Sequence, residues 1–217
     1  MSAAPETLET FHWTEALARL DELAQDGPWE RDGDRGAYVQ DDLRVRPPLV
    51  LPVPVEARTL EEYLESCLEE PGAETVILLQ AGAASIARFD RGEPLVTKSI
   101  KKYVVRGTGR AQPTHLESKG KSRYGSRLRL QNAKRLLEET NERLLDWEEE
   151  FGPADQVLYN APVRLWPDLF EARPAPPFDR EGPLVRIPLD LPRPTTDVLL
   201  RAYRSCEYGR LERVEPA

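Results

Sequence analysis

The sequence has few of the residues that build metal and redox sites. Its 217 residues include two cysteines, Cys67 and Cys206, and two histidines, His12 and His115. Neither cysteine has a second cysteine or a histidine at metal-binding spacing, and two isolated cysteines do not make a disulfide framework. We therefore expect a reduced, cytoplasmic protein with no metal site and no cofactor, in which both cysteines act as small buried hydrophobic residues.

Long apolar runs are also missing. No run approaches the roughly 18 residues that a membrane span requires. The first residues, "MSAAPETLETFHW", contain neither a basic n-region nor an apolar h-region, so we do not expect a secretory signal or any membrane partner. Hydrophobic residues still make up 40% of the chain, which is enough for a core and argues against global disorder.

The acidic net charge of −8 conceals a basic block. Residues 98–135 hold twelve lysines and arginines and one acidic residue, Glu117. This block carries +11, and subtracting it from −8 leaves −19 for the rest of the chain. A basic block in an acidic protein indicates a local contact with a polyanion. The alternative, a solvated charged face, usually mixes both signs.

Hydrophobic periodicity predicts an α/β fold. Helices are expected over residues 13–24, 59–70, 126–150, 165–172 and 195–206. Short extended pieces are expected within residues 38–55, and strands within 74–82, 84–92, 93–105, 155–162, 182–189 and 207–215. This order favours a central mixed β-sheet with flanking helices. Residues 1–70 are expected to add helices and short strands that pack on the same domain, or a small separate cap, and residues 71–217 to form the main domain.

The longest predicted helix has an apolar stripe that we expect to face the sheet. Its members are Leu130, Ala133, Leu137, Thr140, Leu144, Trp147 and Phe151. Basic residues occupy the first half of this helix and acidic residues the second half, the reverse of the order that a helix dipole favours. The cost is modest, about 0.3–1 kcal/mol for a charge at a helix end. We infer that the basic residues are placed for an external partner, for which a phosphate backbone is the natural choice.

A predicted strand before this helix runs into Gly107 and Gly109, which resembles the start of a nucleotide-binding loop. A dinucleotide loop would need a third glycine at position 112, which is Gln112, and a helix there, whereas Pro113 follows. A P-loop ending at Ser122 would need a glycine at position 115, which is His115. Both readings fail. A long basic loop remains, which we expect to be mobile in the free protein and whose glycines permit close approach to a ligand.

The residues "KKYVVRGTGRAQ" and "GSRLRLQNAKRLLEE" resemble the Vms-like release factor (VLRF) family, which acts in ribosome-associated quality control. That family is related to the central GGQ domain of eukaryotic and archaeal peptide-chain release factors, in which a strand, a basic glycine-rich loop ending in glutamine and a long helix follow one another. The resemblance covers roughly residues 75–170 and extends weakly to the C-terminal helix and strand. One departure is that Arg110 and Ala111, not two glycines, precede Gln112.

The resemblance implies a fold like the release-factor middle domain, with a protruding basic loop and with residues 71–217 as the catalytic domain. It implies Gln112 as the catalytic residue, Gly107 and Gly109 as determinants of loop geometry, and His115 as a possible accessory group. The basic residues around the loop would then bind RNA: Lys101, Lys102, Arg106, Arg110, Lys119, Lys121, Arg123, Arg127, Arg129 and Lys134. The implied partners are the large ribosomal subunit and peptidyl-tRNA, and we expect a monomer.

Three readings of the function stay open from the sequence. The first is a hydrolase that releases stalled nascent chains by cleaving the peptidyl-tRNA ester, or that cuts the tRNA near its CCA end. The second is a non-catalytic factor that binds RNA or the ribosome through the same basic block. The third is a decayed paralogue that occupies the site without chemistry.

Overall fold

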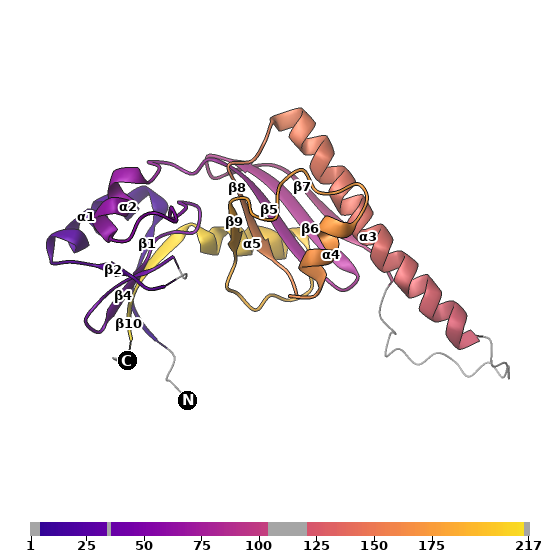
Figure 1. Cartoon of the computed structure of the whole chain (residues 1–217), viewed down its shortest axis with the longest axis horizontal. Helices are drawn as coiled ribbons and strands as arrows, with labels where there is room; N and C mark the ends of the chain where they lie inside the picture. The colour runs from indigo at the N-terminus through magenta and orange to yellow at the C-terminus, as the bar shows by residue number, and fades with distance from the viewer. Residues whose placement is uncertain (1–4, 34–35, 104–120, 215–217) are drawn as a thin grey trace. The chain divides into compact units, whose positions relative to one another are not determined.

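The computed structural model describes residues 5–33, 36–103 and 121–214 of the chain (Figure 1). The chain forms two compact units. Unit 1 consists of Met1–Glu74, Phe89–Pro94 and Leu200–Ala217. Unit 2 consists of Thr75–Arg88 and Leu95–Leu199. The assignment of residues 71–217 as one catalytic domain stays a prediction, because compactness alone does not identify a functional domain.

Unit 1 is built on a small antiparallel sheet. Its elements are β1 (Glu6–His12), α1 (Trp13–Gln25), β2 (Glu30–Arg31), β3 (Tyr38–Gln40), β4 (Leu43–Arg46), α2 (Leu60–Ser66) and β10 (Tyr208–Arg213). The strand order is β1-β10-β4-β3-β2, and every neighbouring pair is antiparallel. The described N-terminal strands therefore form a sheet of their own together with the C-terminal strand.

Three elements of unit 1 differ from the sequence prediction, and one of them is the unexpected two-residue strand β2. No strand was expected before residue 13, yet β1 pairs with β10 along its length. The helix expected over residues 59–70 begins where it was predicted. The Thr59 side chain caps it by accepting a hydrogen bond of 3.2 Å from the Glu62 amide. It ends at Ser66, because Cys67 already has an extended backbone and Leu68 beyond it is 44% exposed.

Unit 2 contains the predicted mixed sheet. Its elements are β5 (Ala73–Gln80), β6 (Ala83–Asp90), β7 (Glu93–Lys101), α3 (Lys121–Phe151), β8 (Gln156–Asn160), α4 (Leu165–Glu171) and β9 (Leu184–Arg186), and α5 (Thr196–Cys206) begins in it. The strand order is β7-β6-β5-β8-β9. Two-residue turns join β5 to β6 and β6 to β7, which makes these neighbours antiparallel, whereas β8 and β9 are parallel. The α/β prediction with a mixed sheet is confirmed.

Helices cover both faces of this sheet. On one face, Ile77, Ile86 and Ile100 share a hydrophobic cluster with Leu136 of α3 and Leu169 of α4. Side chains alternate along a strand, so Ser85 and Ser99 point to the other face. There the hydroxyl groups of Ser85 and Ser99 lie 3.0 Å apart, and that of Ser99 lies 3.1 Å from the hydroxyl group of Thr196 in α5. Nearly every residue of β5 and β6 is consequently buried, as expected for strands covered on two sides.

Candidate nucleic-acid interface

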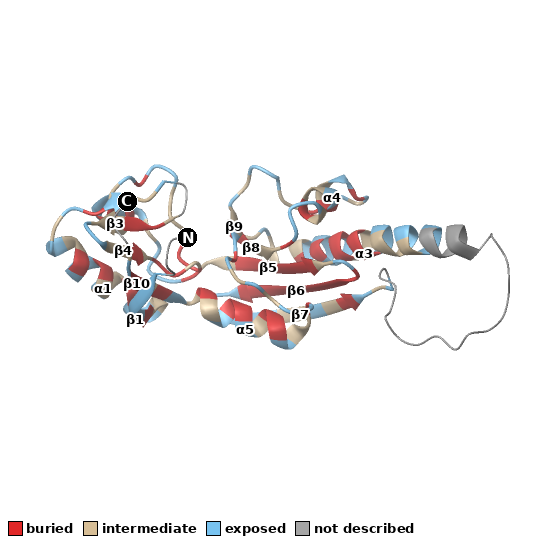
Figure 2. Ribbon diagram, turned by 90° about the horizontal axis from the view of Figure 1, so that it is seen from below, coloured by how far each residue is buried: buried red, intermediate tan, exposed pale blue. Residues whose placement is uncertain are grey.

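Helix α3 has a buried part and an exposed part (Figure 2). From Leu136 onward it contributes buried residues to the cluster, among them Leu144 and Trp147. None of residues 127–135 is buried, and Leu130 is 74% exposed. The prediction that the apolar stripe faces the sheet over its whole length is therefore wrong at Leu130. The helix also begins at Lys121, five residues before the predicted start.

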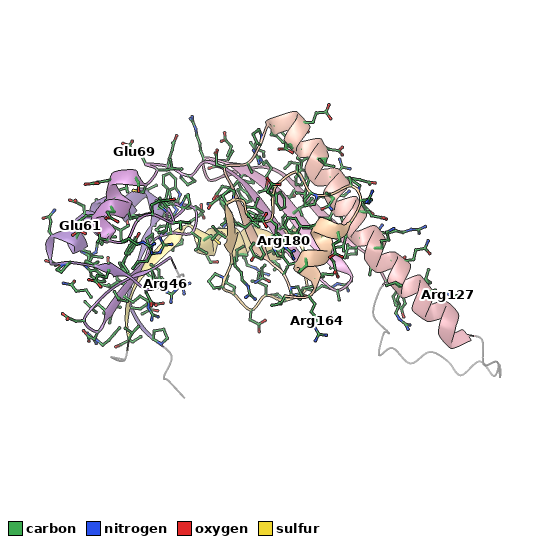
Figure 3. The ribbon with its side chains drawn as sticks, in the orientation of Figure 1. Arg46, Glu61, Glu69, Arg127, Arg164 and Arg180 are labelled. Atoms are coloured by element: carbon green, nitrogen blue, oxygen red, sulfur yellow. The ribbon has the colours of Figure 1, made fainter. Side chains whose placement is uncertain are left out.

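The exposed part of α3 carries three of the predicted RNA-binding residues with described side chains. Arg127 is exposed (Figure 3), Arg129 is half-buried, and Lys134 is 71% exposed in an ion pair of 3.4 Å with Glu138. Arg127 and Lys134 are seven residues apart, so they share one stripe of the helix. Arg129 lies seven residues before Leu136, on the stripe that becomes buried further along. The basic side chains thus lie on more than one side of α3.

The end of β7 brings two further predicted residues to α3. Lys101, the last residue of the strand, is exposed. Lys102 forms an ion pair with Glu139 of α3, and its backbone amide donates a hydrogen bond of 3.0 Å to the Gly82 carbonyl. The side-chain amide of Asn132 then donates a hydrogen bond of 2.8 Å to the carbonyl of Tyr103. The chain therefore reaches residue 103 in contact with the side of α3.

The remaining predicted site residues lie outside the described part of the chain. They are Arg106, Gly107, Gly109, Arg110, Gln112, His115 and Lys119. Lys121 and Arg123 belong to the first turn of α3, but their side chains are outside the description as well. Their roles, and the protruding loop itself, stay predictions.

No sequence motif marks the residues that hold α3 in place, in its middle and at its C-terminal end. Asn132 and Glu139 contact the end of β7, and no motif marks them, because their partners are a backbone carbonyl and a lysine more than 28 residues away. The buried guanidinium of Arg88 donates hydrogen bonds of 3.1 and 2.6 Å to the carbonyls of Gly152 and Pro153, just beyond the helix, and one of 3.1 Å to the Thr75 hydroxyl. The sequence signal for Arg88 was its position as the only charged residue within the buried part of strand β6.

Gly152 allows α3 to stop where Arg88 can reach it. Its φ of +81° is in the left-handed region that favours glycine, and its amide donates a hydrogen bond of 2.9 Å to the Glu148 carbonyl. The last turn of the helix contains no basic residue of its own. Arg88 therefore supplies the positive charge that stabilises the negative end of the helix dipole.

Over residues 5–33, 36–103 and 121–214, the structure contains no cluster of three or more His, Cys, Asp and Glu side chains suited to a metal ion. Within the same ranges, no helix combines the length and the apolar character of a membrane span. Cys206 is buried as expected, and its burial raises the pKa of its thiol to about 12. Cys67 is only half-buried, so the prediction that both cysteines are buried is wrong for Cys67; its partial burial still raises the pKa of its thiol.

A family model describing the Bacteroidetes VLRF1 release factor (bVLRF1) matches residues 74–213, well over half of the chain. The chain belongs to this release factor family. The match runs from β5 to β10 and so includes β7, the 104–120 segment and α3. Release factors act in translation on the ribosome, with hydrolase-type activity as their general character. The resemblance to the VLRF family noted in the sequence is thereby confirmed.

Two solved structures show a weaker likeness. The first, titled "Vms1 mitochondrial localization core", has a TM-score of 0.48 at 12% identity, with 93% of this chain and 82% of that one covered. The second, a crystal structure of the archaeal translation termination factor aRF1, has a TM-score of 0.37 at 16% identity, with 61% of this chain covered. The chain spans only 37% of the length of aRF1. A search of curated protein sequences found no match.

Proposed function

We propose that this protein is a ribosome-associated quality-control release factor, which frees stalled nascent chains from peptidyl-tRNA on the large ribosomal subunit. The observation that carries the proposal is the match of residues 74–213 to a release factor family. The matched region contains the long helix α3, whose exposed part bears basic side chains. We propose that the protein acts in the cytoplasm as a monomer.

The exposed part of α3 is suited to phosphate contacts. Arg127 is exposed and makes no ion pair among the described residues, and Lys101 is exposed at the end of β7. Lysines and arginines that neutralise RNA phosphates release counterions, so each contact adds about 0.7–0.9 to the slope of log affinity against log salt. In the proposal these side chains bind rRNA and the tRNA backbone, and so place the 104–120 segment at the peptidyl-transferase centre.

Gln112 is the proposed catalytic residue, and its role is positional. A carboxamide has no pKa that suits a general base, but it both donates and accepts hydrogen bonds. It would orient a water molecule beside the ester that joins peptide to tRNA, or contact the terminal ribose. The backbone N–H of Gln112 would stabilise the developing oxyanion. Glycines at positions 107 and 109 would let the backbone approach the ester closely.

In this mechanism most of the rate enhancement comes from placement inside the ribosome. The isolated protein should therefore be nearly inactive on free peptidyl-tRNA. The bond that breaks is either the ester or a phosphodiester near the CCA end of the tRNA. The ester is the bond that a water-orienting glutamine serves directly, and the tRNA product of the reaction distinguishes the two.

A second candidate function rests on a departure from the release-factor pattern. Arg110 and Ala111 stand where that pattern has two glycines. In this alternative the protein binds RNA or the ribosome without chemistry. Both candidates need the basic side chains, and only the first needs Gln112. Substitution of Gln112 therefore separates them.

The test uses stalled large ribosomal subunits carrying labelled peptidyl-tRNA, with wild-type protein and Gln112→Ala side by side. One gel resolves free peptide, intact tRNA and CCA-trimmed tRNA. We expect wild-type protein to release peptide, and Gln112→Ala to co-sediment with the subunit without releasing it. Co-sedimentation of both proteins with no release by either would leave the binding factor and reject the enzyme.

A further inference from the structure

We propose that Lys102, Glu139 and Asn132 form a brace that fixes the start of the 104–120 segment against α3. Lys102 is then a positioning residue and not an RNA contact. The effect of the brace on release rests on the proposed function, but the brace itself is a property of the free protein. The two can therefore be tested separately.

The direction of the Lys102 side chain follows from the strand that precedes it. Ile100 of β7 is 3% exposed and belongs to the cluster that contains Leu136 and Leu137 of α3. Alternate residues of an extended chain point to the same side, so Lys102 is also directed toward α3. There it meets the Glu139 carboxylate. Lys101, one residue earlier, points to the opposite side and is exposed.

Asn132 and Glu139 are spaced to act together. Seven residues make two helical turns, so the two side chains lie on one stripe of α3. Leu136, which is 1% exposed, lies between them on the same side and anchors that stripe to the core. The Asn132 amide holds the Tyr103 carbonyl at 2.8 Å, while Glu139 holds the Lys102 ammonium group. Two successive residues of the chain are thus attached to positions two turns apart on the helix.

The ion pair also decides what Lys102 can offer to RNA. Its side chain is 29% exposed, and that of Glu139 is 42% exposed. A phosphate that approached the Lys102 ammonium group would meet the negative charge of Glu139 at the same place. Lys101 and Arg127 have no acidic partner among the described ion pairs. Lys101 and Arg127 are therefore better suited than Lys102 to a phosphate contact.

The brace fixes Tyr103, the residue that precedes the 104–120 segment. The residue that follows the segment is Lys121, which lies eleven residues before Asn132 along α3, or about 16 Å at 1.5 Å per residue. Gln112 is nine residues from Tyr103 and nine from Lys121, so each end limits it to a radius of about 30 Å. Loss of the brace frees the position of Tyr103, from which one of these limits is measured, and leaves the other basic side chains in place.

The first experiment measures hydrogen exchange in the free protein with Lys102→Glu, Glu139→Lys and the double charge swap. The probe is the backbone of residues 98–103, in which the Lys102 amide is bonded to the Gly82 carbonyl. Each single variant should speed exchange there by about two- to fivefold, the range of a partly exposed ion pair, and the swap should restore protection. Equal exchange in all four proteins would overturn the brace, whether or not the protein releases peptide.

The second experiment measures single-turnover release at saturating protein and, separately, the salt dependence of subunit binding. Lys102→Met should slow release by about two- to fivefold and leave the salt slope unchanged, whereas Lys101→Met should reduce the slope by about one. Asn132→Ala should slow release by about two- to tenfold, the range of one hydrogen bond. A fall in the salt slope with Lys102→Met would show an RNA contact and overturn the proposal.

A matched control lies on the same helix. Arg143 and Asp146 form an ion pair of 3.1 Å with side chains that are 44% and 59% exposed, on the part of α3 away from residue 103. Swapping their charges should change neither the exchange of residues 98–103 nor release. If this swap slowed release as much as Lys102→Glu does, the effect would be a general one of charge on α3, and the brace would be rejected.

Discussion

The two parts of α3 have the same backbone and opposite surroundings. From Leu136 to Trp147 the helix contributes four of its leucine and tryptophan side chains to the core of unit 2. From residue 127 to residue 135 it contributes no buried side chain, and Leu130 is 74% exposed. Both parts belong to one continuous helix of 31 residues. The difference therefore arises from whether a sheet lies alongside and not from helix propensity.

The charges divide along the same line. Basic residues lie in the exposed part, and acidic residues dominate the part that packs on the sheet. The dipole of α3 disfavours this order. At the C-terminal end Arg88 offsets the cost by donating to the carbonyls of Gly152 and Pro153. The comparison teaches that the packed part of the helix supports a second part that carries basic side chains and, over residues 127–135, contributes nothing to the core.

The largest effect should come from removing the anchor of the packed part. Trp147 is 5% exposed within the core cluster, so Trp147→Ala should lower the free energy of unfolding by about 4 kcal/mol through lost burial and a cavity. Leu130→Ala is the matched control in the exposed part and should change it by less than about 0.5 kcal/mol. Urea denaturation measures both. Similar losses for the two variants would mean that both parts pack equally.

A smaller loss should follow from removing the cation at the end of the packed part. Arg88→Met should cost about 3 kcal/mol, because the carbonyls of Gly152 and Pro153 and the Thr75 hydroxyl lose their charged donor inside the protein. The hydrogen exchange of the last turns of α3 should rise more than that of residues 127–135. A uniform rise along α3 would contradict the assignment of Arg88 to its C-terminal end.

Asn141 should contribute less. Its side-chain amide donates hydrogen bonds of 2.8 Å to the carbonyls of Leu169 and Pro174, which attach α4 and the following chain to the packed part of α3. Asn141→Ala should lower the free energy of unfolding by about 1–2 kcal/mol. Thermal unfolding would show this as a lower Tm, with faster proteolysis between residues 171 and 181. An unchanged Tm would mean that these two bonds contribute nothing net.

The smallest effect on stability, and a clear effect on binding, is expected in the exposed part. Arg127→Gln should leave the free energy of unfolding unchanged within about 0.5 kcal/mol, since the side chain is exposed. It should reduce the salt slope of large-subunit binding by about one. Arg143→Gln, in the packed part, is the control and should leave the slope as it is. Equal slopes for wild type and Arg127→Gln would remove Arg127 from the interface.

Much of the fold was predictable because it depends on local patterns. The meander of β5, β6 and β7 follows from three strand-like runs separated by glycine-containing turns, and Gly82 and Gly92 adopt the positive φ of such turns. Strand β1 was not predictable in the same way. It has few apolar residues, and its partner β10 lies about 200 residues further along the chain. Its hydrogen bonds depend on that distant pairing, which no local window contains.

The candidate site divides likewise. The sequence indicated the basic block, because residues 98–135 contain twelve basic residues and only one acidic residue. It gave no sign that Lys102 meets Glu139 or that Asn132 holds Tyr103. The first pairing joins residues 37 positions apart, and the second has a backbone carbonyl as its acceptor. Neither leaves a spacing that a motif could record.

By itself the sequence determined the α/β class, the long helix, the sign of charge along it and the family, since each is written in residue type and short-range order. Only the tertiary structure decided where α3 leaves the sheet, which lysine is paired and which is exposed, and that the C-terminal strand joins the N-terminal ones. The physical reason is the same in each case. These features depend on which distant segments meet, and burial and hydrogen bonding are settled only when they do.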